Sequence, residues 1–214
     1  MNMVKRSFGL LLALAASAAF AAAPAQAEAP DVLIKRISQE ILDLAKTDKR
    51  LQAGDQERIM EVVQVKVIPY VDFQRMTAMA AGRFWREATA EQQSMLTKEF
   101  RTLLIYTYAG AISQVRNQKI EYKPLRASPD EDEVEVRTMV QQPRGEPIQL
   151  NYRLEKTDSG WKIYDVNILG AWLVETYKGS FSSEIGKSGI DGLIKTLVER
   201  NKRLAVAPPK PAKS

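Results

Sequence analysis

The sequence contains no cysteine and no histidine. Without cysteine the chain forms no disulfide bond, so its stability has to come from a packed core. The two absences also remove the ligands of most zinc and transition-metal sites and leave only oxygen ligands. Catalysis by a serine–histidine or cysteine–histidine pair is excluded as well. An acid or base would have to be Asp, Glu, Lys or Tyr, and the composition therefore favours a binding protein over an enzyme.

Two other features are missing. The phosphate-binding pattern G-x-x-x-x-G-K-[ST] does not occur, so energy for any directional process has to come from a partner. The formal net charge of +5 is a mild excess, and no Lys/Arg cluster is interleaved with aromatic residues on one face. We therefore expect no nucleic acid among the partners.

Residues 1–27 have the composition of a cleavable secretory signal peptide. Lys5 and Arg6 form a short basic region, residues 8–20 are an apolar run too short to span a bilayer, and Ala25-Gln26-Ala27 fits the small-x-small cleavage pattern. The alternative, a membrane anchor, is disfavoured by that pattern. We therefore predict that the chain is exported.

The rest of the chain has the length of one domain. We place this domain at residues 28–202, because no internal repeat or linker divides it. Residues 203–214, which end in a Pro- and Lys-rich stretch, are predicted to be a disordered tail.

Apolar residues recur at helical spacing in the first half of the domain. This spacing predicts helices over residues 31–48, with Asp31 as the cap, over 52–67, and over 72–81. Thr89 and Gln92 form a capping box that opens a long helix ending near residues 116–117. Its apolar stripe comprises Met95, Leu96, Phe100, Leu103, Leu104, Tyr108, Ile112 and Val115.

The period then changes to two, which is typical of strands. Alternation predicts strands over 134–140 and 148–154. Residues 119–125 and 161–169 are predicted to be strands as well, the last because Ile163, Tyr164 and Val166 favour extended backbone. The short turns between the strands indicate an antiparallel meander. Helices return after Gly170, up to about residue 178, with a short one at 182–187 and another from Ser188. The fold class is α+β: a sheet of four or five antiparallel strands wrapped by N- and C-terminal helices.

Residues 67–112 and several later segments contain a distinctive series of short motifs. They are Pro69, Asp72-Phe73, Gly82-Arg83-Phe84-Trp85, Glu91-Gln92, Phe100, Leu103-Leu104, Tyr108, Trp161, Tyr164-Asp165-Val166, Gly179-Ser180-Phe181 and residues 189–197. In these motifs and their order the chain resembles the MlaC family, also called the toluene-tolerance family of periplasmic phospholipid-binding proteins. One segment departs from the pattern: Leu169-Gly170-Ala171-Trp172 stands where many members have Glu-Gly-x-Ser. No polar role of that Glu or Ser carries over here.

The resemblance implies a hydrophobic cavity between the sheet and the helices. It implies a periplasmic carrier that shelters phospholipid tails in this cavity and maintains the lipid asymmetry of the outer membrane. It implies two protein partners: an inner-membrane ABC transporter complex with a membrane-anchored substrate-binding subunit, and an outer-membrane lipoprotein–porin complex. The phospholipid is then the cargo, and no cofactor is expected.

The last strand, residues 161–169, is apolar on both faces, and with the resemblance this suggests one face for the core and one for a ligand. The long helix would form the wall that faces the sheet, through Phe100, Leu104, Tyr108 and Ile112. The expected lipid-binding residues are Phe84, Phe100, Leu104, Tyr108, Ile112, Val134, Val136, Leu150, Tyr152, Tyr164, Val166, Ile168, Trp172 and Val174. For each of them, membership of the plain core is the alternative.

Two competing functions remain open at this point. A small cone-like α+β enzyme acting on an apolar substrate would use Asp165 as acid or base, with Tyr164 and Tyr152 beside it; alternatively, Asp165 is a buried carboxylate paired with a Lys or Arg. A cell-envelope interaction module without ligand would have a filled core and a large apolar surface patch.

Overall fold

The structure is a computed structural model and describes residues 28–115, 117–128, 130–143 and 145–206. The expected signal peptide, residues 1–27, and residues 207–214 of the expected tail lie outside the described residues. Helix α7 continues to Val206, past the point where we expected the tail to begin. Within the described part of the chain, no helix combines the length and the apolar character needed to cross a membrane.

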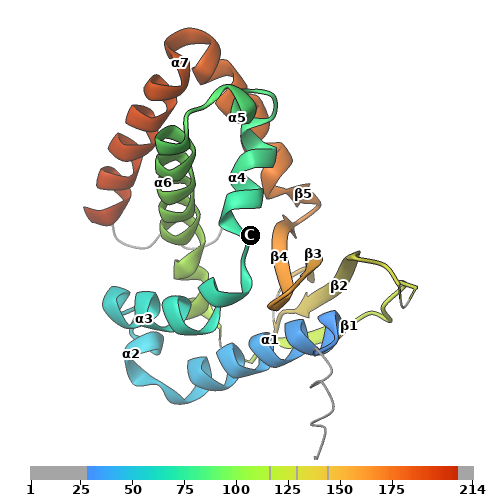
Figure 1. The fold of residues 1–214 in the computed structure, drawn as a ribbon. Coiled ribbons are helices and arrows are strands. Elements are labelled where there is room, and N and C mark those ends of the chain that lie inside the picture. The colour runs from blue at the N-terminus through green and yellow to red at the C-terminus, as the bar shows by residue number, and fades with distance from the viewer. Residues whose placement is uncertain (1–27, 116, 129, 144, 207–214) are drawn as a thin grey trace, which may run out of the picture.

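The strands form one antiparallel sheet in the order β1-β2-β3-β4-β5 (Figure 1). They are β1 (Lys119–Tyr122), β2 (Glu133–Gln141), β3 (Ile148–Thr157), β4 (Gly160–Ile168) and β5 (Ala171–Trp172). The predicted meander is confirmed, and β5 is the fifth strand. It follows a tight turn in which Leu169 and Gly170 both have positive φ, at 54° and 90°.

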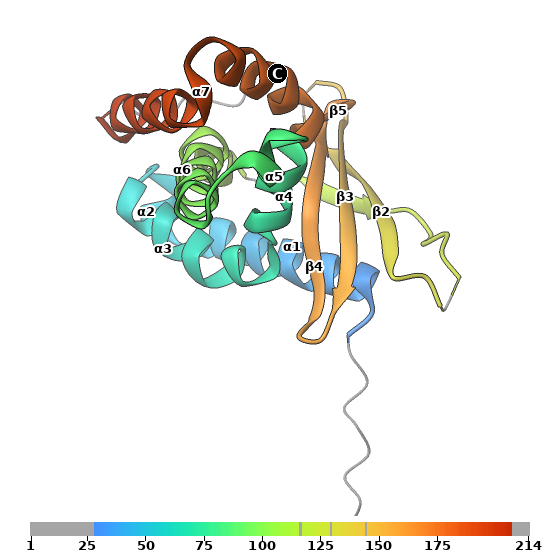
Figure 2. The same ribbon diagram turned by 45° about the horizontal axis from the view of Figure 1, so that its top comes forward.

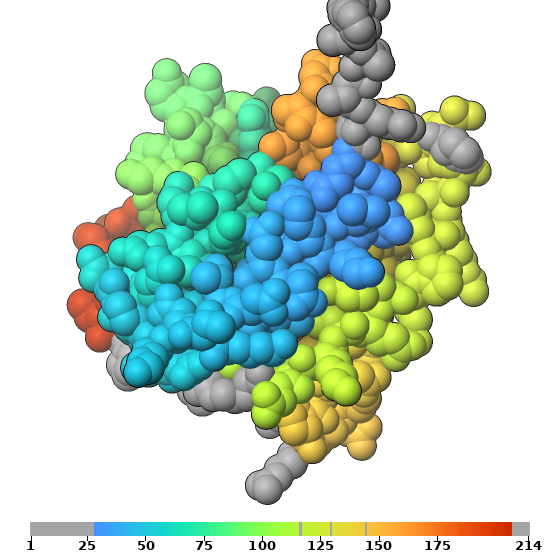
Figure 3. All heavy atoms as spheres, turned by 90° about the horizontal axis from the view of Figure 1, so that it is seen from below, coloured from blue at the N-terminus to red at the C-terminus, as the bar shows by residue number. Residues whose placement is uncertain are grey.

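Helix α1 (Pro30–Thr47) lies across one face of this sheet, as the space-filling view from below shows (Figure 3). Its first half is packed tightly against alternating strand residues in a core made of Leu33, Ile34, Ile37, Val134, Val136, Leu154 and Ile163. The prediction that Asp31 caps this helix is wrong. The helix begins after Ala29, no side chain caps it, and Pro30 occupies the first turn. Proline suits this position because its missing N–H would have no partner there anyway.

The remaining helices form a layer beside the sheet (Figure 2). They are α2 (Lys49–Gln52), α3 (Gln56–Lys66), η1 (Ile68–Tyr70), α4 (Phe73–Ala81), α5 (Phe84–Glu87), α6 (Ala90–Tyr108), η2 (Ala109–Gln114) and α7 (Leu173–Val206). The capping box of α6 is confirmed, since the side chains of Thr89 and Gln92 each accept a hydrogen bond from the other's backbone N–H.

Other helix boundaries also differ from those expected. The helix expected from residue 52 starts at Gln56, because the Asp55 carboxylate accepts a hydrogen bond from the Arg58 N–H and so caps the helix. Helix α6 ends at Tyr108, and the chain continues as the tighter η2 turn. The expected short helices after Gly170 form α7, which is broken at Gly189, where φ is 73°.

The core of the helical layer explains how α6 is oriented. The Phe100 ring is fully buried and packs edge-on against Tyr177 and Phe181 of α7, with ring centroids 4.9 and 5.0 Å apart. Leu96, Leu103 and Leu104 complete this side of the helix. The apolar stripe of α6 therefore faces α7 and α4, and the opposite side of α6 is left for the surface.

Candidate functional site

An apolar cavity of about 350 Å³ lies between the second half of α1, η2 and strands β1 to β3. It exists because α1 packs tightly on the sheet only through its first half. Past Ile37, the helix and the sheet enclose a space. The lining residues are Ser38, Ile41, Leu42, Ala111, Gln114, Val115, Gln118, Ile120, Val140, Gln142, Ile148, Leu150 and Tyr152.

The strand residues of this lining share one face of the sheet. Ile148, Leu150 and Tyr152 alternate along β3, and Val140 lies opposite Ile148 on β2. Polar groups are few: Ser38 and three glutamines on η2 and the flanking loops. Burial raises the pKa of the Tyr152 phenol, so its hydroxyl stays protonated at neutral pH. The arrangement suits an uncharged, flexible hydrocarbon better than a polar substrate.

The expected lipid-binding residues fall into several places. Leu150 and Tyr152 line the apolar cavity, while Val134 and Val136 lie on the same sheet face under the first half of α1. The helical core or its edge contains Phe84, Phe100, Leu104, Tyr108, Val166, Ile168 and Val174. Lipid contact by any of these residues stays a prediction.

Three of the expected residues have other neighbours. Ile112 lies in η2 against the small core around Val62 and Val63. The Tyr164 hydroxyl donates to Glu133 at 2.8 Å, and the Trp172 ring lies under the Arg153 guanidinium at 3.8 Å.

The expectation that the long helix faces the sheet through Phe100 and Leu104 was wrong, because helical periodicity identifies a buried face but not its neighbour. Sequence reasoning also missed Ile120, Val140 and Ile148, although their alternation with Leu150 places them on one face and gave the signal.

Asp165 does not have the surroundings of a catalytic group. Its carboxylate is 1% exposed, does not line the cavity under α1, and accepts hydrogen bonds from the backbone N–H groups of Val166 and Val174 at 2.9 and 3.1 Å. Arg153 lies 3.5 Å away. Burial raises the pKa of Asp165, and these N–H groups and Arg153 oppose that rise. The side chain therefore joins β4 to the first turn of α7 as a buried, paired carboxylate.

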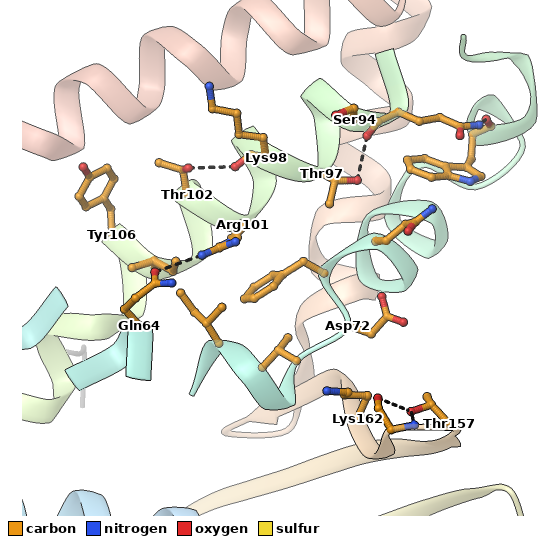
Figure 4. A pocket seen from close by; sticks show the side chains of 18 of the residues that line it. Gln64, Asp72, Ser94, Thr97, Lys98, Arg101, Thr102, Tyr106, Thr157 and Lys162 are labelled. Carbon is orange, nitrogen blue, oxygen red and sulfur yellow. Dashed lines mark hydrogen bonds between the residues drawn. The ribbon is translucent and has the colours of Figure 1, made fainter. Parts of the chain in front are cut away.

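A second hollow, of about 1120 Å³, follows the outer side of α6 (Figure 4). We call it the α6 groove. Its walls come from α6 on one side and from α3, η1, the start of α4 and the β3–β4 turn on the other. The lining is mixed, with Ile68, Val71, Phe73 and Trp85 among many hydroxyl, amide and cationic side chains. It therefore lacks the dry character of the cavity under α1.

The described residues hold no group of three or more acidic side chains placed to bind a metal ion. Comparison with known families gives the decisive result: the family model described as MlaC protein matches residues 35–199.

The chain belongs to the MlaC family.

Relatives in this family are similar over most of their length. The MlaC protein of Haemophilus influenzae, an intermembrane phospholipid transport system binding protein, is 25% identical over 168 residues, covering 77% of this chain and 78% of that one. The toluene tolerance protein ttg2D of Pseudomonas putida is 25% identical over 184 residues, covering 86% and 84%. A phospholipid-binding protein from Ralstonia solanacearum, solved in complex with a phospholipid, is 45% identical with a TM-score of 0.77, covering 82% and 98%.

Proposed function

We propose that this MlaC-family chain is a periplasmic phospholipid carrier that holds acyl chain in the cavity between α1 and the sheet. The observation that carries the proposal is an apolar cavity under α1 in a chain whose 45% identical relative was solved with a phospholipid. The carrier takes up and delivers lipid at an inner-membrane ABC transporter complex and an outer-membrane complex. The name of the Haemophilus influenzae relative, which places that protein in a transport system, supports these partners.

The energetics explain why such a cavity is needed. Each methylene taken out of water contributes about 0.8 kcal/mol, so a chain of about fifteen carbons resists leaving a bilayer by roughly 12 kcal/mol. A carrier offsets this cost by surrounding the chain with Leu, Ile, Val and Tyr side chains. The protein makes and breaks no covalent bond in this role, and nothing around Asp165 favours the enzyme alternative.

The size of the cavity indicates that it opens further when lipid enters. A methylene occupies about the volume of a water molecule, ~30 Å³, so 350 Å³ holds about twelve methylenes, which is most of one acyl chain. A phospholipid with two chains needs more room. We infer that α1 and η2 move away from β1 to β3 on loading, because these elements enclose the cavity.

A substitution that fills the cavity tests this function. Leu150→Trp places an indole in the space, while Gln149→Trp places the same group on the other face of β3 as a matched control. Protein purified without added lipid is extracted with organic solvent, and the phospholipid is quantified per mole by mass spectrometry. We expect wild type and Gln149→Trp to carry phospholipid and Leu150→Trp to carry at most about a tenth as much. Equal loading of all three, or no lipid in wild type, would contradict the proposal.

A further inference from the structure

The α6 groove has the length and lining of a peptide-binding site. Along α6 its lining runs from Ala90 to Tyr106, at Ala90, Gln93, Ser94, Thr97, Lys98, Arg101, Thr102, Ile105 and Tyr106. This is one continuous face of the helix, opposite the buried stripe that contains Phe100. At 1.5 Å per residue it is about 24 Å long, and an extended segment of about seven residues has the same length.

The charge of the groove is one-sided. Three cations line it, Lys98 and Arg101 from α6 and Lys162 from β4, against the single carboxylate of Asp72 among the described lining residues. That carboxylate already accepts a hydrogen bond from the backbone N–H of Arg75 at 2.8 Å and so caps α4. The Lys162 ammonium donates to the Pro69 carbonyl at 2.6 Å, which fixes it on the wall opposite α6.

Arg101 is the centre of this cationic set. Figure 4 shows its side chain reaching across from α6 to Gln64 of α3, where one N–H donates to the amide oxygen at 3.2 Å. The guanidinium also lies 5.6 Å from the centroid of the Phe73 ring. A guanidinium has five N–H donors, and within the described part of the chain no carboxylate is paired with this one. The half-buried Arg101 therefore offers donors in a fork that matches a carboxylate.

Apolar groups lie at both ends of this polar centre. Trp85 closes the groove near the start of α6, and Ile68 and Ile105 lie near its end. A short, non-polymeric anion such as a lipid headgroup would leave most of this length empty. A flat membrane surface would not reach Arg101, which lies between two helices. An extended protein segment fills both the polar centre and the apolar ends.

We propose that the α6 groove docks an extended segment of a partner protein, about seven residues long, with one or two acidic side chains on Arg101 and Lys98 and apolar side chains toward Trp85 and Ile105. The apolar cavity under α1, which is the proposed lipid site, is lined by none of these residues, so the docking site is separate from it.

Fluorescein-labelled heptapeptides test this directly. One panel carries two glutamates at different spacings with leucine or phenylalanine toward the ends, and a second panel has glutamine at each glutamate position. Binding is followed by fluorescence anisotropy. We expect at least one acidic peptide to bind with a Kd below about 1 mM, its glutamine counterpart to bind at least tenfold more weakly, and binding to weaken as salt rises.

Variants locate the site on the molecule. Arg101→Gln is expected to weaken the best acidic peptide about tenfold, and the exposed Lys98→Gln, which leaves the helix packing alone, two- to threefold. Lys195→Gln on the exposed side of α7 and the cavity-filling Leu150→Trp should leave the Kd for the acidic peptide unchanged. The two proposals can fail separately. If Leu150→Trp still carries lipid and Arg101→Gln no longer binds the peptide, the lipid-site proposal is wrong and the docking proposal is supported.

Three outcomes would overturn the docking proposal. The first is that the protein binds acidic and glutamine peptides equally at every spacing. The second is that Lys195→Gln weakens peptide binding as much as Arg101→Gln does. The third is that Arg101→Gln abolishes binding to anionic phospholipid vesicles but leaves peptide binding intact.

Discussion

Removing the carboxylate of Asp165 should reveal its role as a structural connector. Its Oδ1 accepts the N–H of Val174, which lies in the first turn of α7 and would have no partner within the helix. Asp165→Ala leaves this buried donor and the partly buried Val166 N–H without the carboxylate that accepts from them. Each unsatisfied group costs about 1–3 kcal/mol, so we expect the free energy of unfolding to fall by roughly 2–4 kcal/mol.

Asp165→Asn is the matched control. Its side-chain oxygen still accepts both N–H groups, and only the charge opposite Arg153 is lost. Because Arg153 is partly exposed and stacked on Trp172, water and the indole ring stabilise the guanidinium in the variant. We expect a loss of at most about 1 kcal/mol relative to wild type at pH 7. Urea denaturation followed by circular dichroism, with equal m-values, gives both differences.

The pH dependence provides a second check on the same residue. Burial raises the pKa of Asp165 above its ordinary value of 3.8 in the folded protein. The stability linked to its protonation is fully present below pH 3.8 and is lost as pH rises through the folded pKa. Wild type should therefore gain stability relative to Asp165→Asn as the pH is lowered through that range. The reasoning is refuted if Asp165→Ala unfolds with wild-type stability, or if Asn and Ala cost the same.

Other contacts lead to predictions of the same kind. Arg75 pairs with Glu133 at 2.6 Å and lowers the pKa of that carboxylate. Loss of this pair in Arg75→Gln should cost at most about 1 kcal/mol at pH 7, because the Glu133 side chain is 56% exposed. A lowered folded pKa gives stability above the ordinary 4.5 that is lost on acidification, so the difference from wild type should shrink below that pH in urea titrations. Phe100→Ala removes a fully buried ring that packs against Tyr177 and Phe181, and it should lower the free energy of unfolding by about 3–5 kcal/mol in the same assay. A loss under 1 kcal/mol would contradict the close packing of these three rings.

Local chemistry in the sequence was enough to predict several elements. The hydroxyl and amide of Thr89 and Gln92 define the start of α6, because this pair satisfies two backbone donors at once. Alternating apolar residues predict strands β2 and β3, residues that favour extended backbone predict β4, and the short turns between these strands make the antiparallel order follow. These features depend on neighbours within a few residues, which the sequence shows directly.

The candidate site was harder to predict because it depends on which surfaces meet. The stripe through Phe100 was correctly identified as apolar, but only the fold shows that Tyr177 and Phe181 cover it. Leu150 and Tyr152 line the cavity because α1 packs closely on the sheet through its first half alone. Periodicity gives the face of each element and leaves the spacing between elements undetermined.

The position of the acyl chain is the most direct test of the carrier account. A phospholipid with a nitroxide near the end of one chain is added to delipidated, isotope-labelled protein, and signal broadening of each backbone amide is measured by NMR. The account predicts the strongest broadening at Ile120, Val140 and Leu150 around the cavity. Broadening centred on Phe73 and Arg101 in the α6 groove, or none at all, would contradict it.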